Sequence, residues 1–236
     1  MRFSNRTVVL TGVGREGQVG EVVARAFASE GARVVMLDRD AGRVEARAAS
    51  LRASGFDIRA IPADLTDPAQ VGATASEVGA AYDGRVDALV NMAGGFAMSG
   101  PVADSDPAVW QRMVAINLTT AYLATRAFLP LLRPGRGAIL YFASVAAAAG
   151  GSSAGMAGYA AAKSGVLALM RGVAEEERAA GVRANALAPN AIRTADNVAA
   201  MGASAPYVER EDVAGAALFL TSDAARAITG QTIVLG

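Results

Sequence analysis

The chain of 236 residues contains no cysteine and no histidine. Without cysteine there are no disulfides, thiol nucleophiles or thiolate metal sites. Without histidine there is neither a Ser-His-Asp triad nor the commonest metal ligand. We therefore expect no metal centre, and any acid or base catalysis is left to tyrosine, lysine or the carboxylates.

Lysine is almost as scarce, because 21 of the 22 basic residues are arginine and the remaining one is Lys163. An ammonium group is a compact charge whose pKa shifts readily on burial, whereas a guanidinium is planar and always charged. The two are therefore not interchangeable at a reactive position. A chain that uses lysine once and arginine everywhere else indicates a chemical role for Lys163.

Long hydrophobic runs and an excess of one charge are also lacking. The longest apolar run, 138–149, is interrupted by Ser144 and is too short to span a bilayer, and the N-terminus has no apolar signal-peptide core. Charged residues make up 19% of the chain and sum to a net charge of zero, so no nucleic-acid surface is expected. The sequence predicts a cytoplasmic protein whose partners are small molecules, not nucleic acid or membrane.

Short β-branched and apolar runs alternate along the chain with segments of helical periodicity. The predicted strands are 7–10, 33–37, 57–62, 86–90, 138–142, 182–188 and 232–235. The predicted helices are one ending at Gly31, 41–54, 68–82, 106–132, one that carries Tyr159 and Lys163, and 211–220. With no repeats or linkers, this pattern predicts an α/β fold: a single doubly wound Rossmann-type domain, 1–236, with a parallel sheet flanked by helices.

A glycine-rich loop follows the first predicted strand. Gly12, Gly14 and Gly17 fit the pattern G-x-G-x-x-G, and Asp38 stands at the end of the second strand. Glycines let the backbone approach a pyrophosphate at a helix N-terminus, and an acid in this place suits a ribose. The order of strand, loop, helix and acid predicts dinucleotide binding, and a plain glycine turn is the alternative.

Tyr159 and Lys163 are four residues apart, so on a helix they share one face. A cation beside the phenol favours the phenolate and would bring its pKa, about 10 when unperturbed, towards working pH. The same spacing also occurs where a half-buried tyrosine precedes a solvated lysine. The single lysine of this chain favours the acid/base interpretation.

Over essentially its whole length the chain resembles the short-chain dehydrogenase/reductase family. The family's motifs occur in the family's order: the Thr11-Gly12 loop, Asp64, Asn91-Met-Ala-Gly94, Asn117, Ser144, Tyr159 with Lys163, and Ile228-Thr-Gly-Gln-Thr232. The resemblance implies an NAD(P)-dependent oxidoreductase that interconverts a secondary alcohol and a ketone, such as a 3-oxoacyl thioester or a small cyclic substrate. It also implies a homodimer or homotetramer.

The resemblance assigns roles to the matching residues. Tyr159 is implied as general acid/base on the substrate oxygen and Ser144 as a hydrogen-bond partner of that oxygen. Lys163 is implied to hold the nicotinamide ribose and polarise Tyr159, and Asn117 to position a water in a proton relay. The residues implied to bind the cofactor are Gly12, Gly14, Arg15, Gly17, Gln18, Val19, Gly20, Asp38, Arg39, Asp64, Leu65, Asn91, Ala93, Gly94, Tyr159, Lys163, Pro189, Ile192 and Thr194.

The chain departs from the family pattern in three places. The glycine loop matches only if Gly20 is its final glycine, which makes the loop two residues longer, as in the enoyl-acyl-carrier reductases; those enzymes space their Tyr and Lys further apart. Pro189 is followed by Asn190 where the family has glycine, and asparagine tolerates positive φ. The region 195–206 is short for a substrate lid, so we expect an open substrate side.

Two features disagree about the cofactor. Asp38 is placed to accept hydrogen bonds from both ribose hydroxyls of NAD and to repel the 2′-phosphate of NADP. Arg39 and Arg15 are placed to neutralise that phosphate, although Arg15 has Glu16 beside it as an alternative partner. Because the arginines must lose side-chain freedom to reach the phosphate, the balance favours NAD(H), with NADP(H) as the alternative.

Two rival functions remain open. An enoyl-reductase-like enzyme would fit the long loop, and a catalytically idle dinucleotide-binding sensor or scaffold would fit the odd loop and short lid. The intact set of Asn117, Ser144, Tyr159 and Lys163 argues for an active enzyme.

Overall fold

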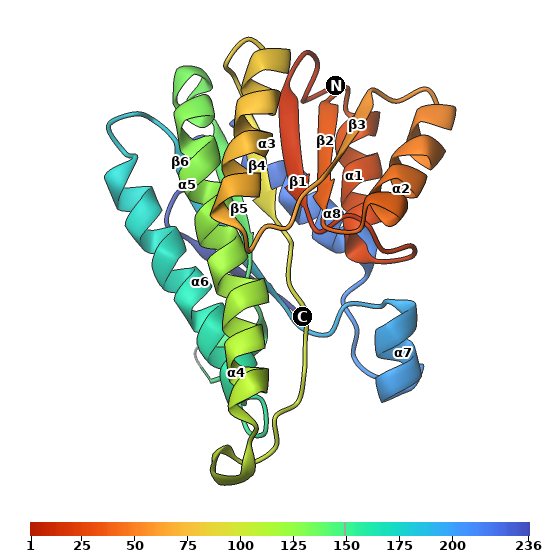
Figure 1. The fold of residues 1–236 in the computed structure, drawn as a ribbon, viewed down its shortest axis with the longest axis vertical. Helices are drawn as coiled ribbons and strands as arrows, with labels where there is room; N and C mark the ends of the chain where they lie inside the picture. Colours follow the sequence, from red (N-terminus) through yellow and green to blue (C-terminus); the bar gives the residue numbers. More distant parts are fainter. Residues whose placement is uncertain (149) are drawn as a thin grey trace.

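The computed structural model describes residues 1–148 and 150–236, in which strands and helices alternate along the chain (Figure 1). The strands are β1 (Thr7–Thr11), β2 (Arg33–Asp38), β3 (Ile58–Pro62), β4 (Ala88–Asn91), β5 (Ala138–Phe142), β6 (Arg183–Pro189) and β7 (Thr232–Leu235). The α-helices are α1 (Val19–Ser29), α2 (Ala41–Ala53), α3 (Pro68–Ala81), α4 (Pro107–Val114), α5 (Thr120–Leu132), α6 (Ala157–Glu176), α7 (Ala195–Met201) and α8 (Arg210–Thr221).

The seven strands form one parallel sheet in the order β3-β2-β1-β4-β5-β6-β7. The chain adds strands outward from β1 to β3, then returns to the other side of β1 and continues outward from β4 to β7. The predicted doubly wound sheet is therefore confirmed. In such a sheet, ligands bind at the carboxyl ends of the strands where the order reverses, which here is the crevice beside Thr11 of β1 and Asn91 of β4.

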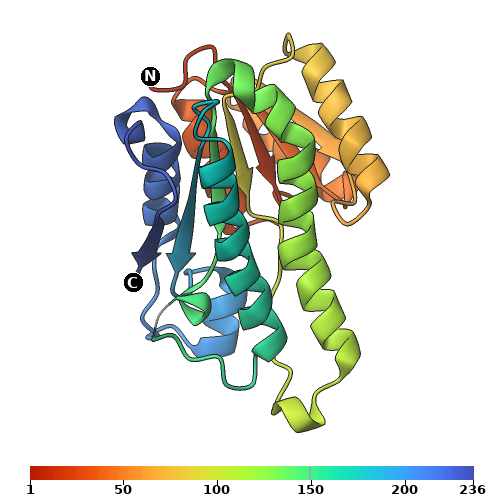
Figure 2. The same cartoon turned by 90° about the vertical axis from the view of Figure 1, so that its left-hand side faces the viewer.

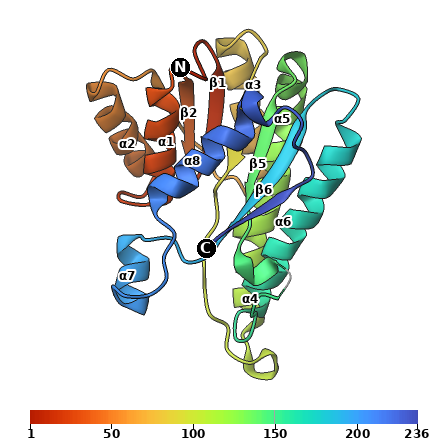
Figure 3. The same cartoon turned by 180° about the vertical axis from the view of Figure 1, so that it is seen from behind.

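Helices cover both faces of the sheet. In β1, Val8 and Leu10 point into one apolar cluster together with α1, α2 and α8, whereas Val9 points into the other with α3, α5 and α6. Figure 2 shows α5 and α6 along one face, and Figure 3 shows α1, α2 and α8 on the other. The near-continuous apolar runs of the strands follow from this arrangement, because both faces of a parallel sheet are buried.

The predicted long helix over 106–132 is continuous but not uniform. Between α4 and α5 lies a π-helical turn, Ala115–Thr119, in which the Thr120 N–H bonds the Ala115 carbonyl five residues earlier. Such turns are rare and are often found at functional sites. This one carries Asn117, and it was not predicted from the sequence.

The turn after β6 differs from the expectation for Asn190. The residue is not among those with positive φ, so the tolerance of asparagine for that conformation is not used. Instead its N–H extends the sheet pairing and donates to the Leu235 carbonyl at 2.8 Å. Among the described residues, no helix combines the length and apolarity needed to cross a bilayer.

Candidate active site

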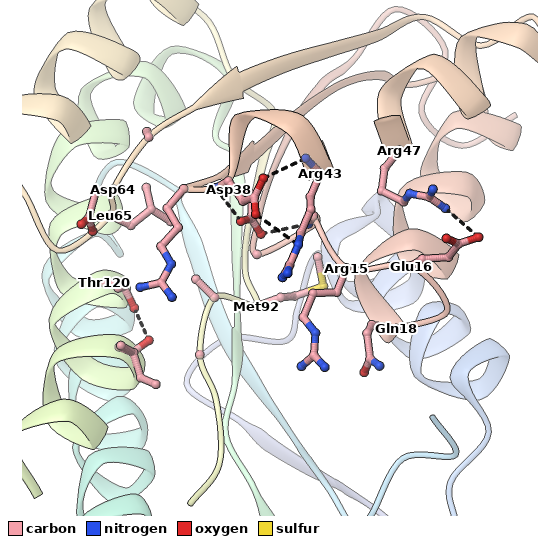
Figure 4. A pocket seen from close by; sticks show the side chains of 18 of the residues that line it. Arg15, Glu16, Gln18, Asp38, Arg43, Arg47, Asp64, Leu65, Met92 and Thr120 are labelled. Atoms are coloured by element: carbon pink, nitrogen blue, oxygen red, sulfur yellow. Dashed lines mark hydrogen bonds and ion pairs between the residues drawn. The ribbon is translucent and has the colours of Figure 1, made fainter. Parts of the chain in front are cut away.

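A cleft of about 900 Å³ lies at the carboxyl ends of β1 to β4 (Figure 4). It is bounded by the glycine loop, the start of α2, the loop after β3 and the π-helical turn. Ten of the residues implied to bind the cofactor line it: Gly12, Gly14, Arg15, Gln18, Asp38, Arg39, Asp64, Leu65, Ala93 and Gly94. The switch point of the sheet and this cleft are thus the same place.

The glycine loop is glycine-rich for steric reasons. Gly12 has φ of +75°, and a Cβ there would lie 2.7 Å from the Ala93 Cα. Gly17 has φ of +67°. A Cβ on Gly20, inside the first turn of α1, would lie 2.9 Å from the Gly12 carbonyl oxygen. Helix α1 therefore packs closely against the end of β1 and presents its N-terminus at the cleft, the arrangement that suits a pyrophosphate.

Asp38 is held rigidly at the end of β2. Its Oδ2 accepts a hydrogen bond from the Gly14 N–H at 2.9 Å, and its Oδ1 accepts one from the Asp40 N–H at 3.1 Å. A Cβ on Gly14 would lie 2.7 Å from the Asp38 carboxyl carbon, so Gly14 leaves room for this carboxylate. The two backbone donors leave acceptor capacity on both oxygens for further donors in the cleft.

Ion pairs occupy most of the arginines around the cleft. Arg15 pairs with Asp196 of α7, not with the adjacent Glu16, so that suggested pairing is wrong. Glu16 is instead 3.4 Å from Arg47 of α2, a contact that Figure 4 shows at the rim. Asp196 and Arg47 were missed by sequence reasoning, because only the tertiary fold brings α7 and α2 to the glycine loop.

Asp64 and Arg39 stand on the opposite wall. The Asp64 Oδ1 accepts hydrogen bonds from the Thr66 hydroxyl at 2.7 Å and the Thr66 N–H at 2.9 Å. These bonds, and to a smaller extent the charge of Arg39, hold the pKa of the Asp64 carboxyl below its usual value. Among the described residues, none places a carboxylate within 4 Å of Arg39, unlike Arg15, Arg43 and Arg47.

Three of the predicted catalytic side chains come from neighbouring elements. Ser144 follows β5 by two residues, and Tyr159 and Lys163 occupy the first two turns of α6. Lys163 is 6% exposed, and its Nζ donates a hydrogen bond to the Phe142 carbonyl at 2.7 Å. The same Nζ lies 5.9 Å from the centroid of the Tyr159 ring. The shared face predicted from the spacing is confirmed.

The pKa values of this pair differ from the expectation. Burial raises the pKa of Tyr159, and a hydrogen bond with Ser144 opposes that rise only in part. The predicted lowering of the phenol pKa is therefore wrong, because the desolvation of the buried phenolate outweighs the opposing hydrogen bond with Ser144. Burial also lowers the pKa of Lys163 to about 8.

Asn117 is buried with all its side-chain groups hydrogen-bonded. Its Nδ2 donates to the carbonyls of Gly95 at 3.0 Å and Met113 at 3.1 Å, and its Oδ1 accepts from the Gly95 N–H at 3.2 Å. The amide therefore ties the π-helical turn to the loop after β4. Between them lies Gly94, where a Cβ would stand 2.5 Å from the Asn117 Oδ1 and 3.5 Å from the Lys163 Nζ.

Gly94 links the two halves of the site, since it lines the cleft and touches the catalytic side. At the end of β6, Ile192 bridges to Val208 and the Thr194 hydroxyl caps α7. The implied site residues that do not line the cleft are Gly17, Val19, Gly20, Asn91, Asn117, Ser144, Tyr159, Lys163, Pro189, Ile192 and Thr194. The parts of the chain that the structure describes contain no cluster of three acidic side chains suited to a metal.

Comparisons with known proteins agree with this geometry. Residues 12–235 match the family model described as enoyl-(acyl carrier protein) reductase. The chain is 34% identical to 2-(S)-hydroxypropyl-CoM dehydrogenase 3 of Xanthobacter autotrophicus, over 97% of this chain and 94% of that one. It is also 34% identical to meso-2,3-butanediol dehydrogenase of Serratia marcescens, over 99% and 94%. The structure of a short-chain type dehydrogenase/reductase from Mycobacterium ulcerans superimposes with a TM-score of 0.90 at 32% identity, covering 99% of this chain and 89% of that one.

We predict that Gly94→Ala disrupts the site, because the added methyl cannot fit against Asn117 without moving the loop after β4. A loss of about 1–3 kcal/mol in the free energy of unfolding is expected for such overpacking. Urea denaturation measures it. Gly172→Ala in α6, where a Cβ meets nothing within 4 Å, is the matched control and should be neutral or stabilising. Equal stability of Gly94→Ala and wild type would contradict the packing argument.

We predict that Lys163 makes stability depend on pH in a way that Lys163→Met removes. Its pKa is about 8 in the folded protein and higher when unfolded, so the unfolded state binds more protons between these values. Stability should therefore rise with pH in this range, by about 2 kcal/mol from pH 8 to pH 10 relative to the variant. Denaturant titrations of both proteins at several pH values measure the difference, and parallel pH profiles would contradict it.

Proposed function

Since the chain belongs to the short-chain dehydrogenase/reductase family, we propose that this oxidoreductase uses NAD(P) to interconvert a secondary alcohol and a ketone, with Tyr159 as its general acid/base. The observation that carries the proposal is the placement of Tyr159, Ser144 and the buried Lys163 beside a cleft suited to a dinucleotide. Its relatives include dehydrogenases of butanediol and of hydroxypropyl-CoM, which supports alcohol chemistry.

The residues of the cleft fit a dinucleotide. Gly12 and Gly14 let the loop backbone pack directly against Ala93 and the Asp38 carboxylate, α1 offers its N-terminus, and Asp38 offers free acceptor capacity. Tight packing of Gly20 on Gly12 supports Gly20 as the last glycine of the motif, in a loop two residues longer than usual. A bound nicotinamide would supply the hydride acceptor or donor.

The chain's own residues handle the proton. In the oxidative direction, the Tyr159 phenolate takes the proton from the substrate hydroxyl while Ser144 donates a hydrogen bond to the same oxygen. Lys163 stabilises the phenolate by its charge, which it retains below its pKa of about 8. Asn117 acts by positioning, since its amide holds Gly95 and thereby the loop beside Lys163.

The spacing of Tyr159 and Lys163 supports an alcohol–ketone substrate over an enoyl substrate, although the family model carries the enoyl reductase description. We expect Tyr159→Phe to lower kcat by about 10²- to 10⁴-fold, because it removes the proton-transferring oxygen. The dissociation constant for the cofactor should be nearly unchanged. Absorbance of the reduced cofactor during turnover of a ketone and alcohol panel provides the measurement.

Lys163→Arg is the companion variant, since it retains the charge but not the compact shape that fits under the Phe142 carbonyl. It should also lose activity. A Tyr159→Phe enzyme with more than a tenth of the wild-type rate would refute the acid/base role. A wild-type protein that binds the cofactor and turns over no member of a broad panel would favour the idle sensor or scaffold.

The cofactor is proposed to be NAD(H). The Asp38 carboxylate is fixed by two backbone donors where a ribose would lie, and it opposes a 2′-phosphate. Three nearby arginines, Arg15, Arg43 and Arg47, already have carboxylate partners. Arg39 alone among these four has none, so it is the residue through which NADP(H) would be accepted.

We predict that wild type binds NADH more tightly than NADPH and that Asp38→Ala loses this preference. A charge repulsion of about 1.4 kcal/mol corresponds to a tenfold difference in affinity. Fluorescence titration of both reduced cofactors against both proteins measures it, with Arg39→Ala as a third protein that should not improve NADPH binding. Tighter NADPH binding by wild type would mean that Arg39 outweighs Asp38.

A homodimer or homotetramer is also proposed. The edge strand β7 leaves Val234 and Ile233 exposed, and Phe219 of α8 is exposed as well. An unpaired edge with exposed apolar side chains is a surface that proteins usually cover.

A further inference from the structure

We propose that the substrate is an uncharged ketone or alcohol with a hydrocarbon group, and that Phe96 holds this group beside Tyr159. The proposal rests on the proposed function and names the substrate class of the same site. Three observations carry it: two uncharged segments, the contacts that join them around Tyr159, and the exposure of Phe96.

The first observation is the absence of charge from two long segments. Residues 88–103 and 137–162 contain no Asp, Glu, Lys or Arg, although charged residues make up 19% of the chain. The first segment runs from β4 through the loop before α4. The second runs from β5 through Ser144 to Tyr159 and ends just before Lys163.

The second observation is that these segments meet at the carboxyl end of the sheet. The N–H groups of Ser99 and Gly100 both donate to the Gly155 carbonyl, at 2.7 and 3.1 Å. The Met98 methyl group lies so close to Gly155 that a Cβ there would be 2.9 Å away. Figure 2 shows the loop before α4 and the start of α6 next to each other at this end of the molecule. Together the two loops form one uncharged wall.

The third observation concerns Phe96, which stands on this wall. Its ring meets the Tyr159 ring edge to face, with centroids 5.1 Å apart and planes at 86°. Phe96 is nevertheless 58% exposed, and Met98 is also 58% exposed. An aromatic and a thioether side chain open to solvent beside the proposed acid/base gain stability when an apolar ligand covers them. The exposure also agrees with the open substrate side expected from the short 195–206 region.

The distribution of charge around the site also favours an uncharged substrate. The first cation after the uncharged wall is Lys163, which is buried and bonded to the Phe142 carbonyl. Across the site, Arg15 pairs with Asp196, and Arg193 pairs with Glu209 at 2.6 Å. A carboxylate or phosphate placed against Phe96 would cover apolar surface without gaining a cation from these ion pairs, whereas a hydrocarbon group gains the burial of that surface. The wall therefore selects uncharged substrates.

Two ketones that differ mainly in charge test the substrate class. We expect wild type to reduce 4-methylcyclohexanone with a kcat/KM at least about tenfold above that for 4-oxocyclohexanecarboxylate, because discrimination by a hydrophobic pocket spans roughly 10- to 200-fold per group. An equal or higher kcat/KM for the carboxylate would overturn the substrate class and leave the oxidoreductase activity standing. Failure to turn over these ketones or any other carbonyl or alcohol would refute the proposed function itself.

Variants at Phe96 test the residue. Phe96→Ala should lower kcat/KM for 4-methylcyclohexanone about tenfold, mainly through KM, whereas Phe96→Leu should retain most of it. Phe96→Arg should reverse the preference in favour of the carboxylate. Ser50→Arg, on the exposed side of α2, adds the same charge far from Tyr159 and should change neither ratio.

The dissociation constant for NADH should be the same in wild type and in all four variants, which separates an effect on substrate from one on the cofactor site. Unchanged kinetics of Phe96→Ala, or an unchanged preference in Phe96→Arg, would overturn the assignment of Phe96.

Discussion

The hydrogen bond between the Lys163 ammonium and the Phe142 carbonyl is the contact on which the arrangement of the site depends. Phe142 ends β5, and Ser144 follows it by two residues. Lys163 lies one turn beyond Tyr159 on α6. This one hydrogen bond between the sheet and the helix therefore sets the positions of all three side chains.

The hydrogen bond is made by a buried charge whose pKa is lowered to about 8, so the fold gives up stability for it. That cost explains why the chain has a lysine here and arginine in every exposed position: burying a guanidinium with its several donors would need more acceptors than one carbonyl provides.

The second constraint on the site is the space that three glycines leave because they have no Cβ. Gly14 makes room for the Asp38 carboxylate, Gly12 for the backbone of Ala93, and Gly94 for the Asn117 amide. In each case the glycine is required by a close neighbour, and only at Gly12 is positive φ also involved. At Gly94, only the backbone separates the cleft from the proposed catalytic side chains. A methyl group at Gly94 would press on the Asn117 amide and stand 3.5 Å from the Lys163 ammonium, so it would disturb the cleft and the proposed catalytic side chains together.

Sequence patterns predicted the parts of this structure that depend on local periodicity and order. The seven strands, the doubly wound parallel sheet and the shared face of Tyr159 and Lys163 follow from apolar runs and helical spacing, and the structure confirms them. The parts that were missed depend on distance in space. Arg15 and Asp196 are far apart in the chain and meet only because α7 folds back over the glycine loop. The π-helical turn at Asn117 was also missed, because it interrupts a segment whose helical character is otherwise continuous. The pKa of Tyr159 was predicted in the wrong direction because a sequence shows which charges are near but not how deeply a phenol is buried.

Charge is distributed unequally between the two halves of the site, and this distribution explains how one crevice can treat two ligands differently. The proposed cofactor half is rich in arginines and carboxylates that form ion pairs with one another. Asp38 and Arg39 are not in these pairs, so their charges have the largest effect on how a charged ligand binds. The substrate half has none of these groups between 88 and 103 or between 137 and 162. A carboxylate in that half would need a cation from elsewhere, whereas an apolar group needs only Phe96 and Met98. In the proposed substrate half, a charged ligand is disfavoured because it finds no partner of opposite charge. The apolar ligand is preferred without any specific polar contact.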